Sequence, residues 1–309
     1  MKSQKYTLNL TEFRCSDGVI LPGLLYEPKR KTKKAAIYLH GNGSSSVFYS
    51  VARMNILAEE LAKINIAFFP FNNRGAQYLH KNTVKGNPEM KEIKSGTAYE
   101  LIDDCIKDIE GAIKKLIGRG YTEIYLIGLS TGANKIVVYN LHRPKNKVKG
   151  YILLSGGDDT GIYYSQLGRK KFCALLEKCK KKIGEGRGER LIGTGLSEIP
   201  MSYNSIFDTI NPDGNYNTFP FYEQMSGLKL SKKQLFVEFG AIKKPMLIVY
   251  GEKDEYCYGN ATLCAGILLE KSGNPKKHTL NIIRNADHGF RGKEKELSNI
   301  ICRWLSAQK

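Results

Sequence analysis

Short, continuous apolar runs recur along the chain and constrain its fold more than any other feature. Most of them are followed by a longer segment whose apolar positions have helical spacing. Runs this short and uniformly apolar are typical of strands buried on both faces of a sheet. Strands are expected at 35–40, 66–71, 123–128, 150–155, 245–251 and 278–283, and helices at 51–63, 97–117, 133–142, 260–271 and 294–307. This alternation predicts an α/β fold with a mostly parallel sheet and helices on both faces.

The two ends of this pattern are marked by different signals. Before the first parallel strand, the segments 6–15 and 19–26 flank the turn residues Ser-Asp-Gly and predict a β-hairpin. Between 156 and 243 the alternation stops, and the chain becomes rich in Gly, Lys, Tyr and Asn. We expect this block to be an insertion over one end of the sheet, without a core of its own. The predicted division is therefore a core domain formed by 1–155 and 244–309, and a cap formed by 156–243.

The composition is that of a globular protein with a strong positive charge. The 309 residues are 41% hydrophobic, which is enough for a sizeable core, and the formal net charge is +18. A charge of this sign suits nucleic acid, anionic lipid or acidic substrates. No helix-turn-helix, zinc-finger or RNA-recognition signature accompanies it, so no specific nucleic-acid partner is expected.

The sequence carries no recognisable targeting or metal-binding signal. It opens without the apolar segment of a signal peptide, and its longest apolar run, 64–71, is too short to span a bilayer. A cytoplasmic protein without a membrane span is expected. The seven cysteines lack C-x-x-C spacing and the five histidines are dispersed, which favours reduced thiols and argues against a zinc site. The sequence does not indicate an oligomeric state.

The segment GLSTG at 128–132 holds one serine between two glycines. A strand is expected to end at Gly128 and a helix to begin by Ala133. This context is typical of a nucleophile elbow, a sharp strand-to-helix turn that exposes a serine hydroxyl and needs small neighbours. The alternative is that Ser130 only caps the helix, which is a common role for serine. The residues that follow Ser130 favour the nucleophile.

A serine nucleophile needs a base, and the base needs an orienting acid. In folds with such an elbow, the chain order is serine, acid, histidine. His278 opens an apolar run and is expected to be structural or exposed, whereas His288 lies in the polar loop before the last helix. His288 is therefore the expected base.

Asp254 is the expected acid because it lies in the loop that follows the strand PMLIVYG. Asp158 and Asp159 are the rival positions, since they follow an earlier strand. Asp287 directly precedes the histidine in sequence, which makes contact with that ring difficult.

The segment LHGNGSS at 39–45 follows the first buried strand and provides flexible backbone near the serine. A tetrahedral intermediate needs N–H donors at this place, and the backbone groups of Asn42 and Thr131 are the expected oxyanion-hole donors. His40 precedes the serine, against the expected order, and is expected to be structural. Arg74, after another strand, is expected to be a buried arginine that ties loops together.

Together these motifs resemble those of the α/β-hydrolase superfamily of serine hydrolases. LHGNG, FNNRG, GLSTG, GEKDE and ADHGF occur in the family's order over nearly the whole chain. The resemblance implies an eight-stranded sheet, a Ser130–Asp254–His288 triad and a cap inserted between the sixth and later strands. Within the superfamily, the segment 201–223 is similar to a group with no settled activity, some of whose fungal members are associated with siderophore metabolism. The dienelactone hydrolase branch fits less well, because its members carry cysteine where this chain has Ser130.

The expected activity is cleavage of a carboxylic ester or related acyl bond in a small-molecule substrate, through an acyl-enzyme and without a cofactor. Thioesters, amides and lactones are cleaved by the same machinery, and a non-catalytic binding protein on this scaffold is the alternative from another class. Between Arg169 and Arg190, nine basic and three acidic residues give this segment of the cap a net charge of +6. This charge predicts either attraction of anionic substrates or an ordinary solvated helix face.

Overall fold

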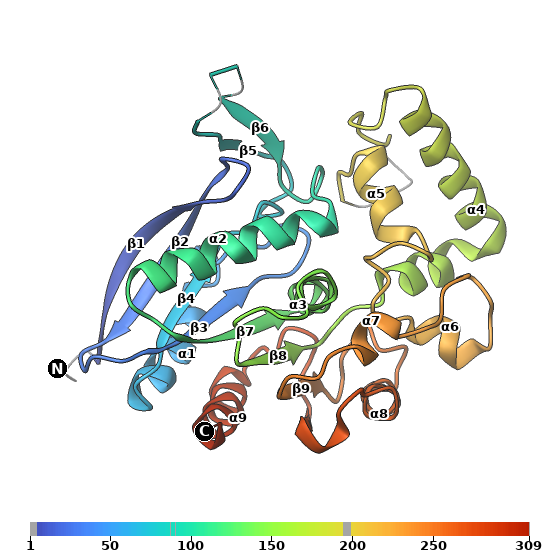
Figure 1. The fold of residues 1–309 in the computed structure, drawn as a ribbon. Helices are drawn as coiled ribbons and strands as arrows, with labels where there is room; N and C mark the ends of the chain where they lie inside the picture. The colour runs from blue at the N-terminus through green and yellow to red at the C-terminus, as the bar shows by residue number, and fades with distance from the viewer. Residues whose placement is uncertain (1–4, 87, 90, 194–198, 309) are drawn as a thin grey trace.

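The computed structural model describes residues 5–86, 88–89, 91–193 and 199–308. Its centre is an eight-stranded sheet in the order β1-β2-β4-β3-β7-β8-β9-β10 (Figure 1). The strands are β1 (Tyr6–Arg14), β2 (Ile20–Pro28), β3 (Lys34–Leu39), β4 (Ala67–Phe71), β7 (Glu123–Leu129), β8 (Gly150–Leu154), β9 (Met246–Gly251) and β10 (His278–Ile283). Of these strands, β2 runs in the opposite direction to the other seven. The expected hairpin and the mostly parallel sheet are confirmed.

Helices cover both faces of the sheet. One face packs against α1 (Val51–Lys63) and α9 (Glu294–Ala307), and the other packs against α2 (Cys105–Gly118), α3 (Thr131–His142) and α8 (Ala261–Glu270). The two faces form two separate apolar clusters. This is the three-layer arrangement that the alternation of strands and helices predicts.

The strand β3 shows why its sequence is apolar throughout. Ala35, Ile37 and Leu39 belong to one apolar cluster, whereas Ala36 and Tyr38 belong to the other. Successive side chains of a strand point to opposite faces, so a strand in the middle layer must be apolar on both.

The segment before α2 differs from the expectation. Residues 97–101 are not helical, and the helix begins with a short 3-10 turn, η1 (Ile102–Asp104). The Thr97 hydroxyl lies within hydrogen-bonding distance of the carbonyl oxygens of Gly43 (2.8 Å) and Gly75 (3.2 Å). This stretch is therefore tied to loops at the edge of the sheet rather than wound into the helix. A small hairpin of β5 (His80–Thr83) and β6 (Glu92–Ser95) precedes it, and no apolar run in the sequence indicates it.

The first part of the insertion forms a layer with its own apolar cluster. Helix α4 (Asp159–Gly184) bends at Gly168, where φ is 70°, and packs against α5 (Tyr203–Ile210). The cluster between them contains Tyr164, Phe172, Leu175, Cys179, Met201, Tyr203, Ile206 and Ile210. The expectation that the block lacks a core of its own is wrong for this part.

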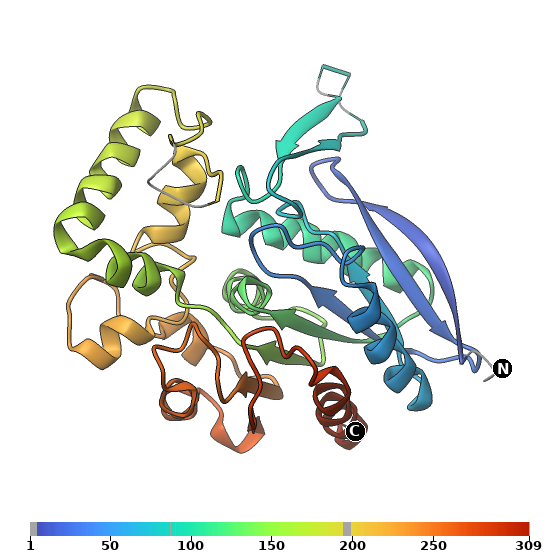
Figure 2. The same cartoon turned by 180° about the vertical axis from the view of Figure 1, so that it is seen from behind.

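The rest of the insertion, with α6 (Phe221–Ser226) and α7 (Val237–Gly240), packs on the body of the protein. Its side chains Tyr216, Phe219, Phe221, Phe236, Phe239 and Ile242 join the apolar cluster of α2, α3 and α8. Figures 1 and 2 show α4, α5 and α6 beyond one end of the sheet. The division into a core of 1–155 and 244–309 and a cap of 156–243 stays a prediction.

The loops that carry the candidate site residues leave one edge of the sheet. Because β3, β4, β7, β8, β9 and β10 are parallel to one another, their carboxyl ends lie along the same edge. In open α/β sheets, ligands bind outside the carboxyl ends of the strands. The insertion begins at this edge, directly after β8.

Candidate active site

Ser130 forms a strained turn between β7 and α3. Its backbone has φ 56° and ψ −128°, a conformation that residues with a side chain rarely adopt. The Ser130 N–H donates to the Leu154 carbonyl at 2.9 Å, and the Ser130 carbonyl accepts from the Ala133 N–H at 2.8 Å. The Ser130 side chain makes no capping hydrogen bond with α3. The structure therefore does not support the alternative of a simple helix cap.

Glycines surround this turn because no side chain fits there. A Cβ at Gly128 would lie 2.2 Å from the Gly132 carbonyl oxygen, and a Cβ at Gly132 would lie 2.2 Å from the Leu39 carbonyl oxygen. A Cβ at Gly41 would lie 2.8 Å from the Cβ of Ser130. The close approach of β3, β7 and α3 at the elbow thus explains the G-x-S-x-G pattern.

His288 and Asp254 lie together, in the loops after β10 and β9. The ring Nδ1 of His288 is 2.9 Å and 3.1 Å from the two carboxylate oxygens of Asp254. The Asp254 side chain is fully enclosed, whereas the His288 side chain is 14% exposed. A proton on Nδ1, held by the carboxylate, leaves Nε2 able to accept one. This pairing is the arrangement that a general base requires.

The loops around His288 hold its ring in place. The Asp254 carboxylate accepts from the Tyr256 N–H at 3.0 Å, and the His288 N–H donates to the Glu255 carboxylate at 3.0 Å. The Tyr256 ring stands edge-on to the imidazole, with 4.6 Å between ring centroids. Among the described residues, no hydrogen bond joins the Ser130 hydroxyl to His288. Such bonds are often long in free enzymes and tighten when a substrate binds.

Asp158, one of the rival acids, is fully engaged in joining the insertion to the body. It accepts from the N–H groups of Gly161 (2.8 Å) and Tyr222 (2.7 Å) and from the Tyr258 hydroxyl (3.0 Å). Burial raises the pKa of Asp158 to about 6, against the opposing effect of these hydrogen bonds. The residue caps α4 and anchors the loop that contains Asp254.

The other two rivals do not bond to the His288 ring either. Asp287 accepts from the Arg291 N–H at 2.8 Å. Asp159 is hydrogen-bonded by Tyr216. Of the four aspartates considered from the sequence, Asp254 is the one that contacts the imidazole in the described part of the chain.

Tyr216 links the two loops that are expected to supply the oxyanion hole. The Asn42 side chain donates to the Tyr216 hydroxyl at 3.2 Å, and the Thr131 hydroxyl lies 3.3 Å from the same oxygen. Across the described ranges, neither the Asn42 N–H nor the Thr131 N–H has a hydrogen-bond partner. Unpaired N–H groups beside a nucleophile are what a developing oxyanion needs.

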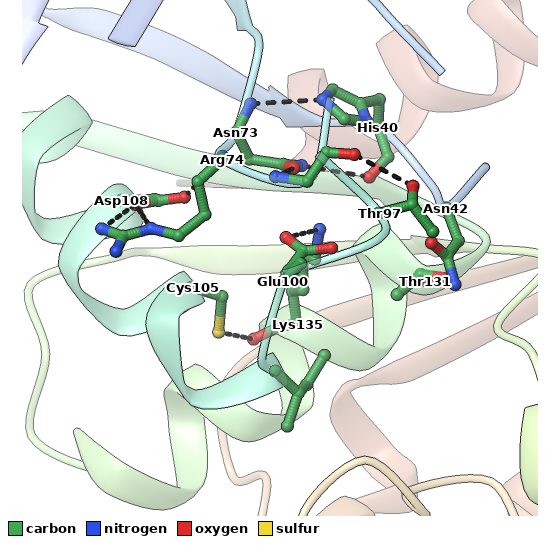
Figure 3. A network of polar contacts seen from close by, with 12 residues as sticks. His40, Asn42, Asn73, Arg74, Thr97, Glu100, Cys105, Asp108, Thr131 and Lys135 are labelled. Carbon is green, nitrogen blue, oxygen red and sulfur yellow. Dashed lines mark hydrogen bonds and ion pairs between the residues drawn. The ribbon is translucent and has the colours of Figure 1, made fainter. Parts of the chain in front are cut away.

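A buried ion pair lies behind the elbow (Figure 3). Lys135 Nζ on α3 is 2.6 Å from Glu100 Oε1, and the two side chains are 0% and 8% exposed. The contact is an ion pair by distance, although the two atoms do not form a hydrogen bond of regular geometry. Burial raises the pKa of Glu100 more than Lys135 lowers it. Glu100 also occupies the space beside Gly75, where a Cβ would lie 2.0 Å from Oε2.

Arg74 ties the loop after β4 to α2 and to the β1–β2 turn, as expected from the sequence (Figure 3). Its guanidinium lies 2.7 Å from Asp108 and 3.0 Å from Asp17, and its N–H donates to Asp108 at 3.0 Å. Burial lowers the pKa of Arg74, but the surrounding carboxylates, Asp108 and Asp104 foremost, raise it well above its ordinary value. The residue is a structural cation.

His40 is a second structural residue of this region. Its Nδ1 donates to the Gly41 carbonyl at 2.7 Å, and its Nε2 accepts from the Asn73 N–H at 3.2 Å. Burial first, and then the charge of Lys135, lower the pKa of His40 to about 3. His278 is also buried and bonded through both ring nitrogens. Neither histidine competes with His288 as the base.

Glu100, Lys135 and Tyr216 are parts of this region that sequence reasoning missed. Lys135 stands in the run ANKIVVYNLH, and a lone lysine in a largely apolar helix is a signal for a buried ion pair. Glu100 falls in the stretch assigned to a helix, and Tyr216 falls in the irregular insertion. Neither position carried a local signal.

A metal site and a membrane-spanning helix are both absent from the described residues. These residues contain no group of three or more His, Cys, Asp or Glu that could hold a metal ion. No helix among them is long and apolar enough to cross a membrane. Two surface grooves of about 930 and 540 Å³ lie along α9 and between α2 and α3, and neither contains a candidate site residue.

A family profile described as "Protein of unknown function (DUF1749)" matches residues 95–307. The matched region is more than half of the chain and includes Ser130, Asp254 and His288. The chain belongs to this family. No curated protein matches the DUF1749 chain significantly. The description names no activity, which agrees with the resemblance of 201–223 to a group with no settled activity. The siderophore association of that group stays a prediction.

Solved structures of esterases and a lipase share the fold of this DUF1749 protein. Est1E from Butyrivibrio proteoclasticus, with bound ferulic acid, has a TM-score of 0.64 at 15% identity, covering 96% of this chain and 98% of that one. A monoglyceride lipase from Saccharomyces cerevisiae has a TM-score of 0.63 at 15% identity, covering 100% and 99%. The Pyrococcus furiosus esterase Pf2001 has a TM-score of 0.59 at 18% identity, covering 98% and 93%. The DUF1749 chain thus has the α/β-hydrolase fold, as the sequence resemblance implies.

Proposed function

We propose that this protein is a serine hydrolase that cleaves a carboxylic ester or a related acyl bond through an acyl-enzyme on Ser130. One observation carries the proposal: the hydrogen-bonded pair of Asp254 and His288 lies at the edge of the sheet where Ser130 forms a strained elbow. The esterases and the lipase with this fold support an acyl substrate.

In the first half of the reaction, the Ser130 oxygen attacks the carbonyl carbon while Nε2 of His288 takes the serine proton. Asp254 holds the ring through Nδ1 and stabilises the imidazolium that forms. The N–H groups of Asn42 and Thr131 donate to the oxyanion of the tetrahedral intermediate. Collapse of the intermediate breaks the bond to the leaving group, which receives the proton from His288.

In the second half, water replaces the leaving group. His288 takes a proton from the water as its oxygen attacks the acyl-enzyme, and a second tetrahedral intermediate forms in the same oxyanion hole. Its collapse releases the acid and returns the proton to Ser130. The insertion at 156–243 would cover this edge as the cap and shape the acyl pocket.

The proposal is tested by hydrolysis of p-nitrophenyl esters of varied chain length. We expect Ser130→Ala to lower kcat by about 10⁴-fold or more, with little change in Tm. Ser155→Ala is the matched control, because Ser155 also has a positive φ, 45°, and directly follows the neighbouring strand β8. Its kcat should stay within a few-fold of the native value. Hydrolysis that persists in Ser130→Ala would overturn the proposal.

A further inference from the structure

One carboxylate beside the candidate site has no basic partner. Asp159 is only partly buried, and it forms no ion pair within the residues that the structure describes. Its Oδ2 lies 3.5 Å from the position that a Cβ of Gly157 would take. Gly157 is bonded twice to the Asn134 side chain, at 2.8 and 3.2 Å. Asp159 is therefore anchored next to α3, the helix that begins after Ser130.

Tyr216 connects Asp159 to both loops of the candidate oxyanion hole. The Tyr216 hydroxyl donates to the Asp159 carboxylate and accepts from the side chains of Asn42 and Thr131. A phenolic hydroxyl has one proton and two lone pairs, and this arrangement uses all three. The carboxylate is thus two hydrogen bonds away from the residues whose N–H groups would hold the oxyanion.

His288 and Tyr256 lie near the same carboxylate, and their rings stand edge-on to each other with 4.6 Å between centroids. Burial raises the pKa of Asp159, whereas the Tyr216 hydrogen bond and the His288 imidazole lower it by less. Burial, and then the charges of Glu255 and Asp159, raise the pKa of Tyr256. Tyr256 is 45% exposed, so its ring is accessible to a ligand.

A partly exposed carboxylate near an exposed tyrosine ring has the chemistry of a cation site. The carboxylate attracts an ammonium group, and the faces of tyrosine rings bind ammonium groups through cation–π interactions. An anionic substrate would instead be repelled at this place. The positive charge of the cap does not change this, because Asp159 has no basic side chain in ion-pair contact.

We propose that Asp159 and Tyr256 form a subsite for an ammonium group, with Tyr216 positioning the Asp159 carboxylate, and that the enzyme prefers acyl substrates that carry a cation near the scissile bond. The inference rests on the proposed hydrolase function, because the subsite borders His288 and the loops of the candidate oxyanion hole. It disfavours the prediction that the basic cap selects anionic substrates.

The subsite is tested with pairs of esters that differ only in charge. Choline and 3,3-dimethylbutyl esters have the same shape and place the charge on the alcohol side. Esters of 4-(trimethylammonio)butyric and 5,5-dimethylhexanoic acid do the same on the acyl side. For at least one pair, we expect native kcat/KM to favour the cationic ester, and Asp159→Asn to lower that preference by about tenfold. Glu177→Gln, which removes an exposed carboxylate from the same helix, is the matched control and should keep the native preference.

Neutral and cationic esters cleaved equally well by the native protein, or with the same ratio in Asp159→Asn, would overturn the subsite.

A binding measurement separates this inference from the proposed function. Choline and 3,3-dimethylbutanol are titrated into native protein and Asp159→Asn and followed by ligand-observed NMR. Choline binding that exceeds alcohol binding and weakens about tenfold in Asp159→Asn supports the subsite, even if no ester is cleaved and the proposed function fails. Equal choline binding by both proteins, or none by either, would overturn it.

Discussion

Two sets of charged groups near the candidate nucleophile differ in whether they are paired. One set lies behind the elbow, on the side of α2 and α3, and the other group, Asp159, lies in front of it, at the start of the insertion. Behind the elbow, Lys135 pairs with Glu100 and Arg74 pairs with Asp108, and each of these side chains is less than a tenth exposed. In front, Asp159 is partly exposed, and its neighbours are a hydroxyl and an imidazole rather than a lysine or arginine. Two opposite charges in contact cancel most of each other's electrostatic potential at a substrate, whereas the potential of an unpaired carboxylate is not cancelled.

This difference predicts two kinds of role: the paired residues stabilise the structure around the site, and Asp159 determines substrate specificity. Removing one partner of a buried pair leaves an uncompensated charge, so substitutions behind the nucleophile should act on stability. Replacing Asp159 removes a charge that nothing neutralises, so that substitution should act on specificity. The four predictions below test this distinction, starting with the candidate catalytic pair of Asp254 and His288.

The largest effect is expected for Asp254→Asn. Asparagine keeps the shape but favours the wrong tautomer of His288, so kcat should fall by about 10⁴-fold. Steady-state kinetics on a p-nitrophenyl ester measures this. Asp158→Asn is the control, because Asp158 contacts the insertion and not the imidazole. A larger loss in Asp158→Asn would move the acid to the loop after β8.

The next largest effect is expected for Lys135→Met. Glu100 would be left buried without a counter-charge, and the free energy of unfolding should fall by about 3–5 kcal/mol. Urea unfolding measures this loss. The double variant Lys135→Met/Glu100→Gln removes both charges and should recover most of it. A double variant no more stable than the single one would show that the pair is not the cause.

A smaller effect is expected for His40 in acid. Its pKa is about 3 in the native state, so between pH 7 and 5 the unfolded state takes up a proton that the native state does not. This difference lowers stability as pH falls, by at most about 1.4 kcal/mol per pH unit. Asp158 and Asp208, whose pKa values burial raises to about 6 and 7, act in the opposite direction over this range.

The contribution of His40 must therefore be measured as a difference between proteins. Urea unfolding at pH 7 and pH 5 should show that His40→Gln, although less stable overall, loses less stability between these values than the native protein does. His80→Gln, on the exposed strand β5, is the control and should keep the native slope. Equal slopes for His40→Gln and the native protein would contradict a buried, neutral His40.

The smallest effect is expected for Tyr216→Phe, in front of the nucleophile. The Asn42 side chain and the Thr131 hydroxyl lose their shared partner, so the oxyanion loops are held less well and kcat/KM should fall about tenfold. Tyr164→Phe removes a hydroxyl from another buried tyrosine of the insertion and should change kcat/KM less than twofold. Equal kinetics for the two variants would show that Tyr216 only packs.

Most of the fold could be predicted from the sequence because its signals are local. The strands β3, β7, β8 and β9 are continuous apolar runs, and their boundaries agree with the expectation within one or two residues. The error at 97–101 has a physical cause: apolar spacing continues into this stretch, but Thr97 and Glu100 bond to loops and to Lys135 instead. Tertiary contacts of this kind leave no periodic signal.

The candidate site shows the same contrast. Ser130 and His288 could be found because glycine spacing and chain order are readable in one dimension. Tyr216 and the role of Asp159 could not, because they depend on how the insertion folds back over the elbow. The apolar cluster between α4 and α5 was missed although part of it is readable in the sequence, because Phe172, Leu175 and Cys179 have helical spacing among the many lysines of that segment.

The central claim is that Ser130 is a nucleophile activated by His288, and active-site labelling tests it most directly. The native protein is treated with a fluorophosphonate, digested, and mapped by mass spectrometry. We predict a single adduct on the peptide that contains Ser130, and labelling at least about 100-fold slower in Asp254→Asn. An adduct on another serine, or native protein that stays unlabelled while it hydrolyses esters, would contradict the account.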